Sequence, residues 1–354
     1  MNIKDRLFIP ILNACASVVP FAALRKITGQ KVIFPTYHLI SDRNVPHVGH
    51  LYKIRSEKLF LEDLEFMLRH FKPITIDELL KWRNGQVRLD KPSFFLSFDD
   101  GLREIKDVIA PILIKKGIPA AFFINPAFID NNEMMFRNKA SLLIDLFKRK
   151  KINFNRTFDT TGIGQDNFIQ KVKSVKYQER DILNKLAIAS EFSFSDYLKE
   201  NKPYLESEEI MQLKQQGFHI GAHSMDHPLY EQISLEEQVV QTSESIDFII
   251  NNDFSRLRTF AFPFTDHRVS AALFNKMYGE MRLDSSFGVA GIKHENYNFH
   301  FQRIPMEKSL DSARQIIAAE FIYYILKSPL GKNHIKKKVT CLCSLNSHLL
   351  QIAF

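Results

Sequence analysis

The sequence lacks the features that mark disulfide-rich, metal-stapled and membrane-spanning proteins. Its three cysteines, Cys15, Cys341 and Cys343, are too few and too badly placed for a disulfide framework or a common zinc spacing. The apolar stretch at residues 7–24 is short and is interrupted by two prolines, which argues against a transmembrane helix. Internal repeats, low-complexity tracts and nucleic-acid motifs are absent from the sequence. These absences indicate a globular protein whose core forms without covalent staples.

The composition is that of an ordinary globular protein with an excess of positive charge. Apolar residues make up 45% and charged residues 25% of 354 residues, a length that fits one large domain with an insertion or two domains. The formal net charge is +8, and much of it lies in runs at residues 148–151 and 336–338, which we interpret as solvated faces or tails. An anionic polymer or a membrane surface is the alternative partner for these runs. The 31 phenylalanines cluster in strand-like runs, which favours a role in the core.

Residues 7–24 allow two further interpretations besides a membrane span. They follow Lys4 and Arg6, and residues 14–16 have the small-residue character of a secretory or lipoprotein cleavage site. The apolar part of such a signal is short here and contains proline. We therefore favour an amphipathic segment, within residues 1–30, that packs on the domain or lies on a membrane surface. This interpretation favours the cytoplasm or the cytoplasmic membrane surface, and a secreted or lipoprotein form is the alternative.

The chain is organised around Ser93–Gly101, which reads Ser-Phe-Phe-Leu-Ser-Phe-Asp-Asp-Gly. An apolar, β-prone run bounded by turn residues predicts a buried strand, and helical periodicity from Ile105 predicts a helix that ends at Gly117. Asp99 and Asp100 therefore lie at the carboxyl end of a strand, the edge where α/β folds bind ligands. Either one carboxylate holds a metal while the other faces a substrate, or the two only form a turn and cap the helix.

Strand and helix signals alternate along the rest of the chain. Capping-box spacing predicts helices that begin at Thr75 and at Ser234. Further strands are predicted at residues 32–38, 120–125, 218–223, 258–264, 285–287 and 301–304. Residues 137–205 depart from this pattern, with helical patches and few strand signals, and are predicted to be an inserted helical subdomain. The alternation implies an α/β fold with a mostly parallel sheet, open or closed into a barrel.

A second candidate group is the stretch His-Ser-Met-Asp-His at residues 223–227, which begins where a strand ends. Two imidazoles four residues apart can converge on one divalent cation. With Asp100 from a second strand end, His223 and His227 would form a two-histidine, one-carboxylate site with open positions, the arrangement of a catalytic zinc. Such a metal polarises a carbonyl and lowers the pKa of bound water to about 7, and Asp99 can accept the proton.

The order Ser-Phe-Asp-Asp-Gly, then His-Ser-x-x-His, then Phe-Pro-Phe at residues 262–264 resembles the polysaccharide deacetylase family, also called the NodB-homology domain or carbohydrate esterase family four. The resemblance covers about residues 32–305 apart from the insertion. It implies a distorted (β/α) barrel of about seven strands and a metal-dependent hydrolase of N-acetyl groups on amino sugars. Zinc is the expected metal, with cobalt or nickel as alternatives. Residues 31–136 and 206–327 would form the deacetylase domain, and residues 328–354 a tail.

Carried over residue by residue, the resemblance makes Asp99 the catalytic base. It makes three residues the metal ligands: Asp100, His223 and His227. The family's third motif usually contains an arginine before its prolines, and here Ala261 stands in that place. The backbone N–H of Phe264, next to Pro263, matches the family's oxyanion donor, and a backbone donor tolerates this change of side chain.

The family's late Leu-x-His motif, which carries the general acid, is not recognisable here. A branch of the family has this acid on a strand before the Asp-Asp motif, and Tyr37-His38 resembles that arrangement. Barrel closure makes the first and last strands neighbours, so His38 is the expected acid, with His300 as the alternative candidate. A structural histidine is the other interpretation of His38. Arg303, grouped with the substrate-binding and oxyanion residues, would orient the base, replace the missing arginine, or only pack.

These residues predict a polysaccharide deacetylase that hydrolyses linear amides of a cell-envelope or capsular glycan. Its expected partner is an N-acetylated glycan and not a nucleic acid. Two alternatives stay open. The first is an O-acetyl esterase on the same site. The second is a glycan-binding relative without turnover, which the missing late histidine motif favours and the intact set of four motif residues disfavours.

Overall fold

The computed structural model describes residues 19–152 and 154–337. Most of the apolar stretch at residues 7–24, all three cysteines and the end of the chain lie outside these described residues. Among the described helices, none is long and apolar enough to cross a membrane.

The main sheet has eight strands in the order β11-β9-β8-β7-β6-β5-β2-β12, and every neighbouring pair is parallel. Its strands are β2 (Pro35–Tyr37), β5 (Leu96–Phe98), β6 (Ala120–Ile124), β7 (His219–Ala222), β8 (Thr259–Ala261), β9 (Ser285–Gly288), β11 (His300–Gln302) and β12 (Ile304–Pro305). Only Arg303 separates β11 from β12, so one segment pairs with β9 through its first half and with β2 through its second. The sheet therefore curves almost into a ring, which confirms the predicted α/β fold and distorted barrel.

Two of the predicted strands are divided between sheets. The segment at residues 32–38 gives β1 (Val32–Ile33) before β2, and Ser93–Gly101 gives β4 (Ser93–Phe94) before β5. The first halves join β3 (Lys72–Pro73) in a small parallel sheet of order β1-β4-β3. A further pair, β10 (His294–Glu295) and β13 (His334–Ile335), joins the C-terminal segment to the edge of the domain.

Phenylalanine fills the core on both sides of the barrel wall, as its clustering in strands indicates. Successive residues of Ser93–Gly101 alternate, so Phe94 and Phe98 pack with the outer helices while Phe95 belongs to a separate inner cluster. Inside, the ring of Phe287 lies 5.4 Å from that of Phe95 and 5.1 Å from that of Phe123. Because this alternation continues, Ser97 and Asp99 follow Phe95 on the inner side, and Asp99 comes to the mouth of the barrel.

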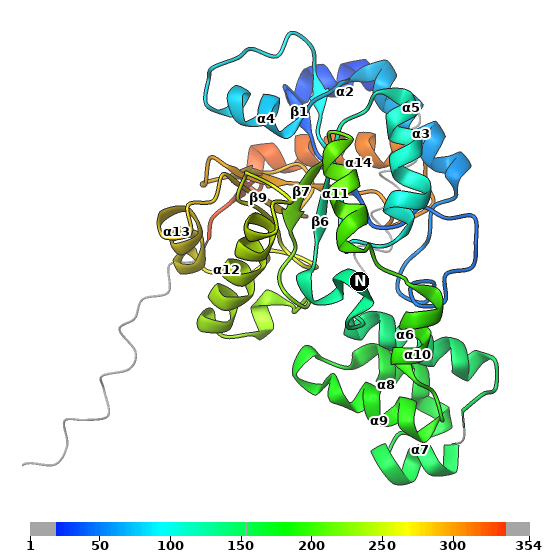
Figure 1. Ribbon diagram of the computed structural model, residues 1–354. Coiled ribbons are helices and arrows are strands. Elements are labelled where there is room, and N and C mark those ends of the chain that lie inside the picture. Colours follow the sequence, from blue (N-terminus) through cyan, green and yellow to red (C-terminus); the bar gives the residue numbers. More distant parts are fainter. Residues whose placement is uncertain (1–18, 153, 338–354) are drawn as a thin grey trace, which may run out of the picture.

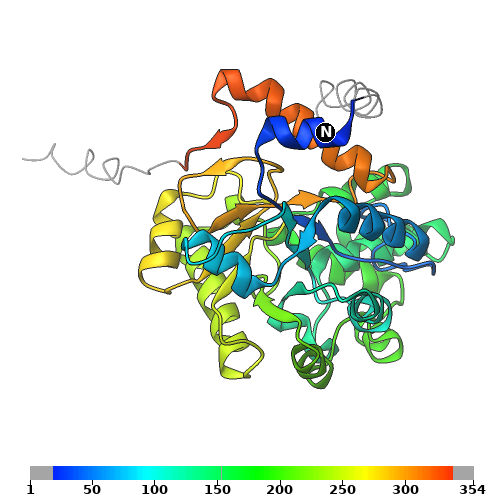
Figure 2. The same ribbon diagram turned by 90° about the horizontal axis from the view of Figure 1, so that it is seen from above.

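The helices around the barrel begin and end largely where the sequence signals stand. They are α2 (Phe21–Thr28), α3 (Glu57–His70), α4 (Ile76–Arg83), α5 (Ala110–Lys116), α11 (Ser207–Gln215), α12 (Leu235–Asn251), α13 (Ala271–Gly279) and α14 (Ala313–Lys327). The predicted capping boxes at Thr75 and Ser234 are confirmed, as is Gly117 after α5 in the left-handed conformation. The helix after Gly101 differs in one respect, since its first turn is a π-helix, Ile105–Ile109. Helix α2 lies along α14, with the rings of Phe21 and Phe321 5.5 Å apart (Figure 2).

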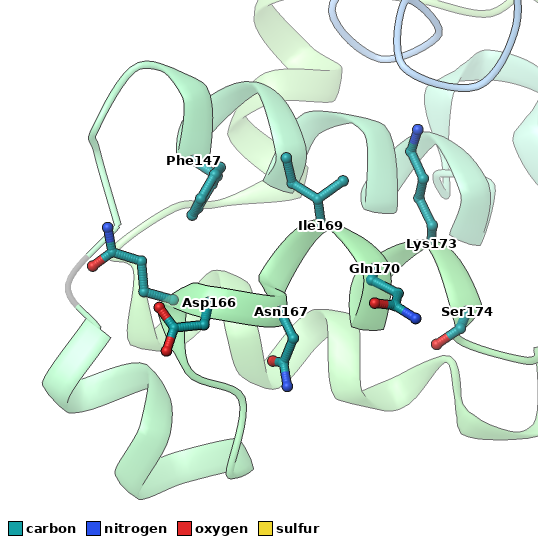
Figure 3. A pocket seen from close by; sticks show the side chains of 8 residues that line it. Phe147, Asp166, Asn167, Ile169, Gln170, Lys173 and Ser174 are labelled. Carbon is teal, nitrogen blue, oxygen red and sulfur yellow. The ribbon is translucent and has the colours of Figure 1, made fainter.

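Between β6 and β7 the chain forms a helical body that stands apart from the sheet (Figure 1). It contains α6 (Phe136–Lys148), α7 (Phe154–Thr161), α8 (Phe168–Ser174), α9 (Asp181–Ala189) and α10 (Phe194–Asn201). A hollow of about 600 Å³ on this body is lined by side chains from α6, α8 and the turn between α7 and α8, Ile169 and Lys173 among them (Figure 3). None of the predicted site residues lines that hollow, so we assign it no part in the chemistry.

Candidate active site

The predicted site residues come from separate strands and meet at one edge of the barrel. Asp99 and Asp100 follow β5, and His223 follows β7. His38 follows β2, and the loop of Phe264 follows β8. Because all these strands are parallel, their carboxyl ends lie at the same edge, which is where α/β barrels place their chemistry.

Several of these residues hold a backbone conformation that non-glycine residues seldom adopt. The φ angle is +74° at Asp100, +64° at Ser224, +65° at His227 and +56° at Phe264. Each left-handed residue costs about 1–3 kcal/mol, and such strain tends to collect where side chains must be aimed at a ligand. Gly101, with φ +62°, completes the tight turn, where an added Cβ would lie 3.1 Å from the side chain of Ile124.

Three side chains that could hold a metal ion converge at this edge, and we call them the metal-ligand group. The Oδ1 atom of Asp100 lies 3.2 Å from His227 Nε2 and 3.4 Å from His223 Nε2, and all three side chains are buried. Asp100 Oδ1 and His223 Nε2 are buried without a hydrogen-bond partner in the described structure. His223 Nδ1 lies 2.8 Å from the backbone oxygen of Ala261, so the proton sits on that nitrogen and leaves the Nε2 lone pair free toward Asp100.

This arrangement fits a divalent metal. Buried polar atoms are almost always satisfied, and here Asp100 Oδ1 and His223 Nε2 face one another at 3.4 Å without a hydrogen-bond partner in the described structure. A cation placed among them would satisfy the carboxylate and both imidazoles together. Burial raises the pKa of Asp100, but His227 and His223 outweigh burial and bring that pKa well below its usual range, so the carboxyl is ionised and ready to bind.

Asp99 lies beside this group and is held by Arg303. The guanidinium binds both carboxylate oxygens, with two contacts of 2.7 Å, and Asp99 Oδ2 lies 3.9 Å from His223 Nε2. Burial raises the pKa of Asp99, but Arg303 and His223 together outweigh burial and lower that pKa below its usual range, so the carboxyl stays ionised. Arg303 is fully buried and also binds the hydroxyls of Thr36 and Ser97. Of the roles expected for Arg303, this geometry supports orienting the base.

His38 lies across the barrel mouth and is held by Glu307, a residue that the sequence analysis missed. The Nδ1 atom of His38 is 2.5 Å from Glu307 Oε2, and the same carboxylate accepts the backbone N–H groups of His38 and Leu39. Burial lowers the pKa of His38, but Glu307 more than offsets it and raises that pKa to about 10. The imidazole is therefore cationic at neutral pH, and it remains 28% exposed toward the mouth. Glu307 follows β12, so the strand-end argument that selected His38 would also have selected Glu307.

His300, the alternative acid, lies in a different group of side chains. Its Nδ1 contacts Ser286 Oγ at 2.7 Å, its Nε2 contacts Asp266 at 3.1 Å, and its side chain is fully buried. Asp266 and Glu295 also pair with Lys337, whose side chain is only 5% exposed. The prediction that residues 336–338 form a solvated run is therefore wrong for Lys337, because two buried carboxylates draw its ammonium inside. Lys338 lies outside the described residues.

The loop after β8 brings Phe264 over the metal-ligand group. Its ring centre lies 4.4 Å from that of His227, and the side chain is 40% exposed. Pro263 before it is buried. Within the described residues, the N–H of Phe264 donates to no acceptor, whereas the neighbouring Thr265 N–H bonds to Pro263. A free backbone donor beside the metal-ligand group can stabilise negative charge on a reacting oxygen.

The helical body between β6 and β7 borders the same edge. The Tyr177 hydroxyl donates to both oxygens of Asp226, at 2.7 and 2.6 Å, and Gln241 donates to Asp226 from α12. On the other side, Ser141 in α6 bonds to the backbone oxygen of Pro46, in the loop after β2. Asp226 thus anchors the loop between His223 and His227, the two candidate ligand histidines, to the helical body. No local sequence signal connects Tyr177 with Asp226, since 49 residues separate them.

The family model described as "Polysaccharide deacetylase" matches residues 86–279. Among solved structures, the Streptococcus pyogenes deacetylase PplD in complex with acetate is 14% identical, with a TM-score of 0.54, over 82% of this chain and 98% of that chain. IcaB from Ammonifex degensii is also 14% identical, with a TM-score of 0.52, over 83% of this chain and 98% of that chain. At this identity the two structures show a shared fold. No curated protein sequence matches the chain.

The matched residues make up more than half of the chain and include both the Asp-Asp and the His-x-x-x-His motifs. Deacetylases of this family are generally metal-dependent, and Asp100, His223 and His227 form a candidate metal-binding group here. The chain therefore belongs to the polysaccharide deacetylase family and is an enzyme of that family.

Proposed function

We propose that this enzyme is a metal-dependent hydrolase that removes N-acetyl groups from amino sugars of a cell-envelope or capsular polysaccharide or oligosaccharide. The observation that carries the proposal is the group of buried, unpartnered ligand atoms of Asp100 and His223, with an ionised carboxylate on one side and a cationic imidazole on the other. A base and an acid on opposite sides of a Lewis-acid site suit amide hydrolysis, in which water must lose a proton and the amine must gain one.

Asp100, His223 and His227 would hold the metal. Two neutral imidazoles and one carboxylate suit zinc best, and cobalt or nickel are the alternatives. When bound, the metal supplies Lewis acidity toward a carbonyl oxygen and toward water. The bond from His223 Nδ1 to the Ala261 oxygen fixes the tautomer in which Nε2 can act as a ligand.

Asp99 would accept the proton from the attacking water. Arg303 binds both carboxylate oxygens of Asp99, which keeps the carboxylate ionised and fixed in place. Each of these oxygens has a further lone pair that would accept the proton. The paired carboxylates of the motif thus divide two tasks, since Asp100 lies against both histidines and Asp99 lies against Arg303.

His38 would protonate the departing amine, which leaves poorly as an anion. Glu307 binds Nδ1, so the proton on Nε2 faces the exposed side of the ring. Glu307 also favours the imidazolium form before the proton is transferred. The N–H of Phe264, supported by Pro263 before it, would stabilise the oxyanion of the tetrahedral intermediate.

We propose the same domain division as the sequence suggests: residues 31–136 and 206–327 form the deacetylase domain, residues 137–205 a helical insertion, residues 1–30 an N-terminal segment and residues 328–354 a tail. The partner is a glycan and not a nucleic acid. A membrane-surface contact through residues 1–30 is supported by Ile27, which is 66% exposed on α2. Leu326 near the end of the adjacent α14 and Leu330 just after that helix are also exposed, by 52% and 64%.

The test is acetate release from a panel of N-acetylated and O-acetylated oligosaccharides by chain reconstituted with zinc, cobalt or nickel. New free amines accompanied by acetate are expected, and release of acetate with new hydroxyls alone would instead identify an O-acetyl esterase. Asp99→Asn should keep its metal and lose about 10²–10⁴-fold in turnover. A wild-type chain that binds metal and glycan but releases no acetate from any member would identify a binding protein.

A further inference from the structure

Arg137 is a positive side chain beside the catalytic edge that lacks an acidic partner in the described structure. Its Nη1 donates to the backbone oxygen of Lys173, at 2.9 Å. No carboxylate oxygen of the described residues lies within 4.0 Å of its guanidinium nitrogens. Burial lowers the pKa of Arg137, and no neighbouring carboxylate offsets this effect. A partly buried charge without a counter-charge costs free energy, and an anionic ligand would offset that cost.

The position of Arg137 in its helix adds to this cost. It stands in the first turn of α6, where the partial positive charge of the helix end disfavours a cation. That first turn contains no acidic residue. A neutral glutamine could donate the same hydrogen bond to Lys173 without the unpaired charge. The bond to Lys173 therefore does not account for the arginine.

The aromatic surroundings connect Arg137 with the metal-ligand group. The centre of its guanidinium lies 4.7 Å from the ring centre of Phe136 and 5.7 Å from that of Phe264. The Phe264 ring also lies 4.4 Å from the His227 ring, and Phe264 is 40% exposed. The partly exposed Phe264 ring therefore lies close both to the Arg137 guanidinium and to the His227 imidazole. A pyranose lying on Phe264 would have one end at the metal-ligand group and the other at Arg137.

We propose that Arg137 and Phe264 form a subsite for an anionic group, a carboxylate or a phosphate, that the glycan carries next to the N-acetyl group to be removed. The inference rests on the proposed function and narrows its substrate class to acidic N-acetylated glycans. The planar guanidinium can bind two oxygens of either anion, while Phe136 and Phe264 limit its solvation and strengthen the pairing. The net charge of +8 favours the approach of such a substrate over long range.

The test is calorimetric binding to metal-loaded Asp99→Asn chain, which prevents turnover. The probes are chitotetraose, which is neutral, a hyaluronan tetrasaccharide, which carries carboxylates next to N-acetylglucosamine, and N-acetylglucosamine 1-phosphate. Adding Arg137→Gln should weaken the binding of at least one anionic probe roughly 10- to 100-fold, because a charged hydrogen bond is lost. The affinity for chitotetraose should change by no more than about twofold. Tighter binding of hyaluronan identifies a uronate-containing glycan, and tighter binding of the phosphate probe identifies a sugar phosphate.

The matched control is Arg149→Gln at the other end of α6, where the guanidinium pairs with Asp145 at 2.7 Å. It removes the same charge from the same helix and should change the affinity for neither anionic probe by more than about twofold. Arg137→Lys should restore part of the anionic affinity, since it keeps the charge but not the planar fork. If Arg137→Gln weakened the binding of neutral and anionic probes equally, Arg137 would have a packing role and the proposed anion subsite would be wrong. Equal affinity of the unsubstituted Arg137 chain for all three probes would also overturn the subsite.

Failure of the subsite and failure of the proposed function give different results. Acetate release from chitotetraose by the wild-type chain tests the deacetylase activity without any anionic group. If acetate is released and Arg137→Gln does not discriminate among the probes, only the subsite is wrong. If no acetate is released from any N-acetylated probe while Arg137→Gln still discriminates, the subsite stands and the proposed reaction is wrong.

Discussion

Two buried groups of metal-ligand side chains occur in the described part of the chain, and they differ in what neutralises them. One contains Asp100, His223 and His227, and the other contains Asp266, Glu295 and His300. In the second group Lys337 supplies an internal cation, and His300 is bonded through both ring nitrogens. In the first group no lysine or arginine reaches Asp100, and Asp100 Oδ1 and His223 Nε2 have no partner.

The difference shows that residue type alone does not identify a metal site. Both groups offer imidazole and carboxylate ligands at similar burial. What separates them is hydrogen-bond and charge balance, because a buried group that already holds an ammonium ion has no need of a metal. Burial raises the pKa of Asp266, but His300 and Lys337 outweigh it and lower that pKa, which is the balance expected of a satisfied salt bridge.

The strongest test of this comparison removes one histidine from each group. His227→Ala should release most of the metal and lower acetate release by about 10³-fold or more, since several kcal/mol of Lewis-acid stabilisation are lost. His300→Ala should keep the metal. Metal content by mass spectrometry and acetate release from chitotetraose check both variants. Loss of metal in His300→Ala, with full occupancy in His227→Ala, would reverse the assignment of the two groups.

The next test compares the two histidines that each pair with a carboxylate, His38 with Glu307 and His300 with Asp266. His38→Ala should keep its metal and lose about 10²–10⁴-fold in turnover of an N-acetyl substrate, because the amine then departs without a proton donor. The loss should be smaller for an aryl acetate, whose leaving group needs no proton. A larger rate loss in His300→Ala than in His38→Ala would identify the late histidine as the acid.

Most of the barrel follows from local patterns in the sequence. The run before Asp99 predicts β5, the capping boxes predict the starts of α4 and α12, and Gly117 predicts the end of α5. The division of that run into β4 and β5 was not predictable, because it depends on which neighbour each half pairs with across the fold. The closure of the barrel at Arg303 was not predictable for the same reason. It requires β11, before Arg303, to pair with β9, and β12, after Arg303, to pair with β2.

The grouping of Asp99, Asp100, His223 and His227 could be predicted because these residues stand in two short motifs, whereas the partners of His38 and Asp266 could not. Glu307 lies 269 positions from His38 along the chain, and it lies beyond the part that the family model matches. Lys337 looked solvated because it stands in a run of lysines, and only the fold reveals the buried Asp266 beside it. Contacts of this kind are set by tertiary structure and have no local periodicity or spacing.

A more moderate effect is expected when the carboxylate that holds His38 is neutralised. In metal-free chain Glu307→Gln should lower the pKa of His38 from about 10, because Glu307 is the strongest of the carboxylates that oppose the effect of burial, ahead of Asp100 and Asp99. The stability that this pair contributes is fully present below pH 6.5, the unfolded pKa, and is lost as pH rises through about 10. NMR titration of the His38 imidazole measures the shift, and the melting temperatures of the two chains should converge above pH 10. An unchanged His38 titration would mean that Glu307 does not hold the ring.

The smallest effect on turnover is expected from Lys337→Ala, which would make the two groups alike. Asp266, Glu295 and His300 would then be buried without an internal cation, so the free energy of unfolding should fall by about 3–5 kcal/mol in metal-free buffer. Added zinc should recover part of that loss and raise the bound metal from one to about two ions per chain, because the emptied group offers three ligands. Turnover should change less than about threefold, since none of the proposed catalytic residues belongs to this group. Lys336→Ala, next to it and exposed, is the matched control and should leave stability and metal content unchanged. If Lys337→Ala behaved as Lys336→Ala does, the ammonium of Lys337 would not be what distinguishes the second group from the first.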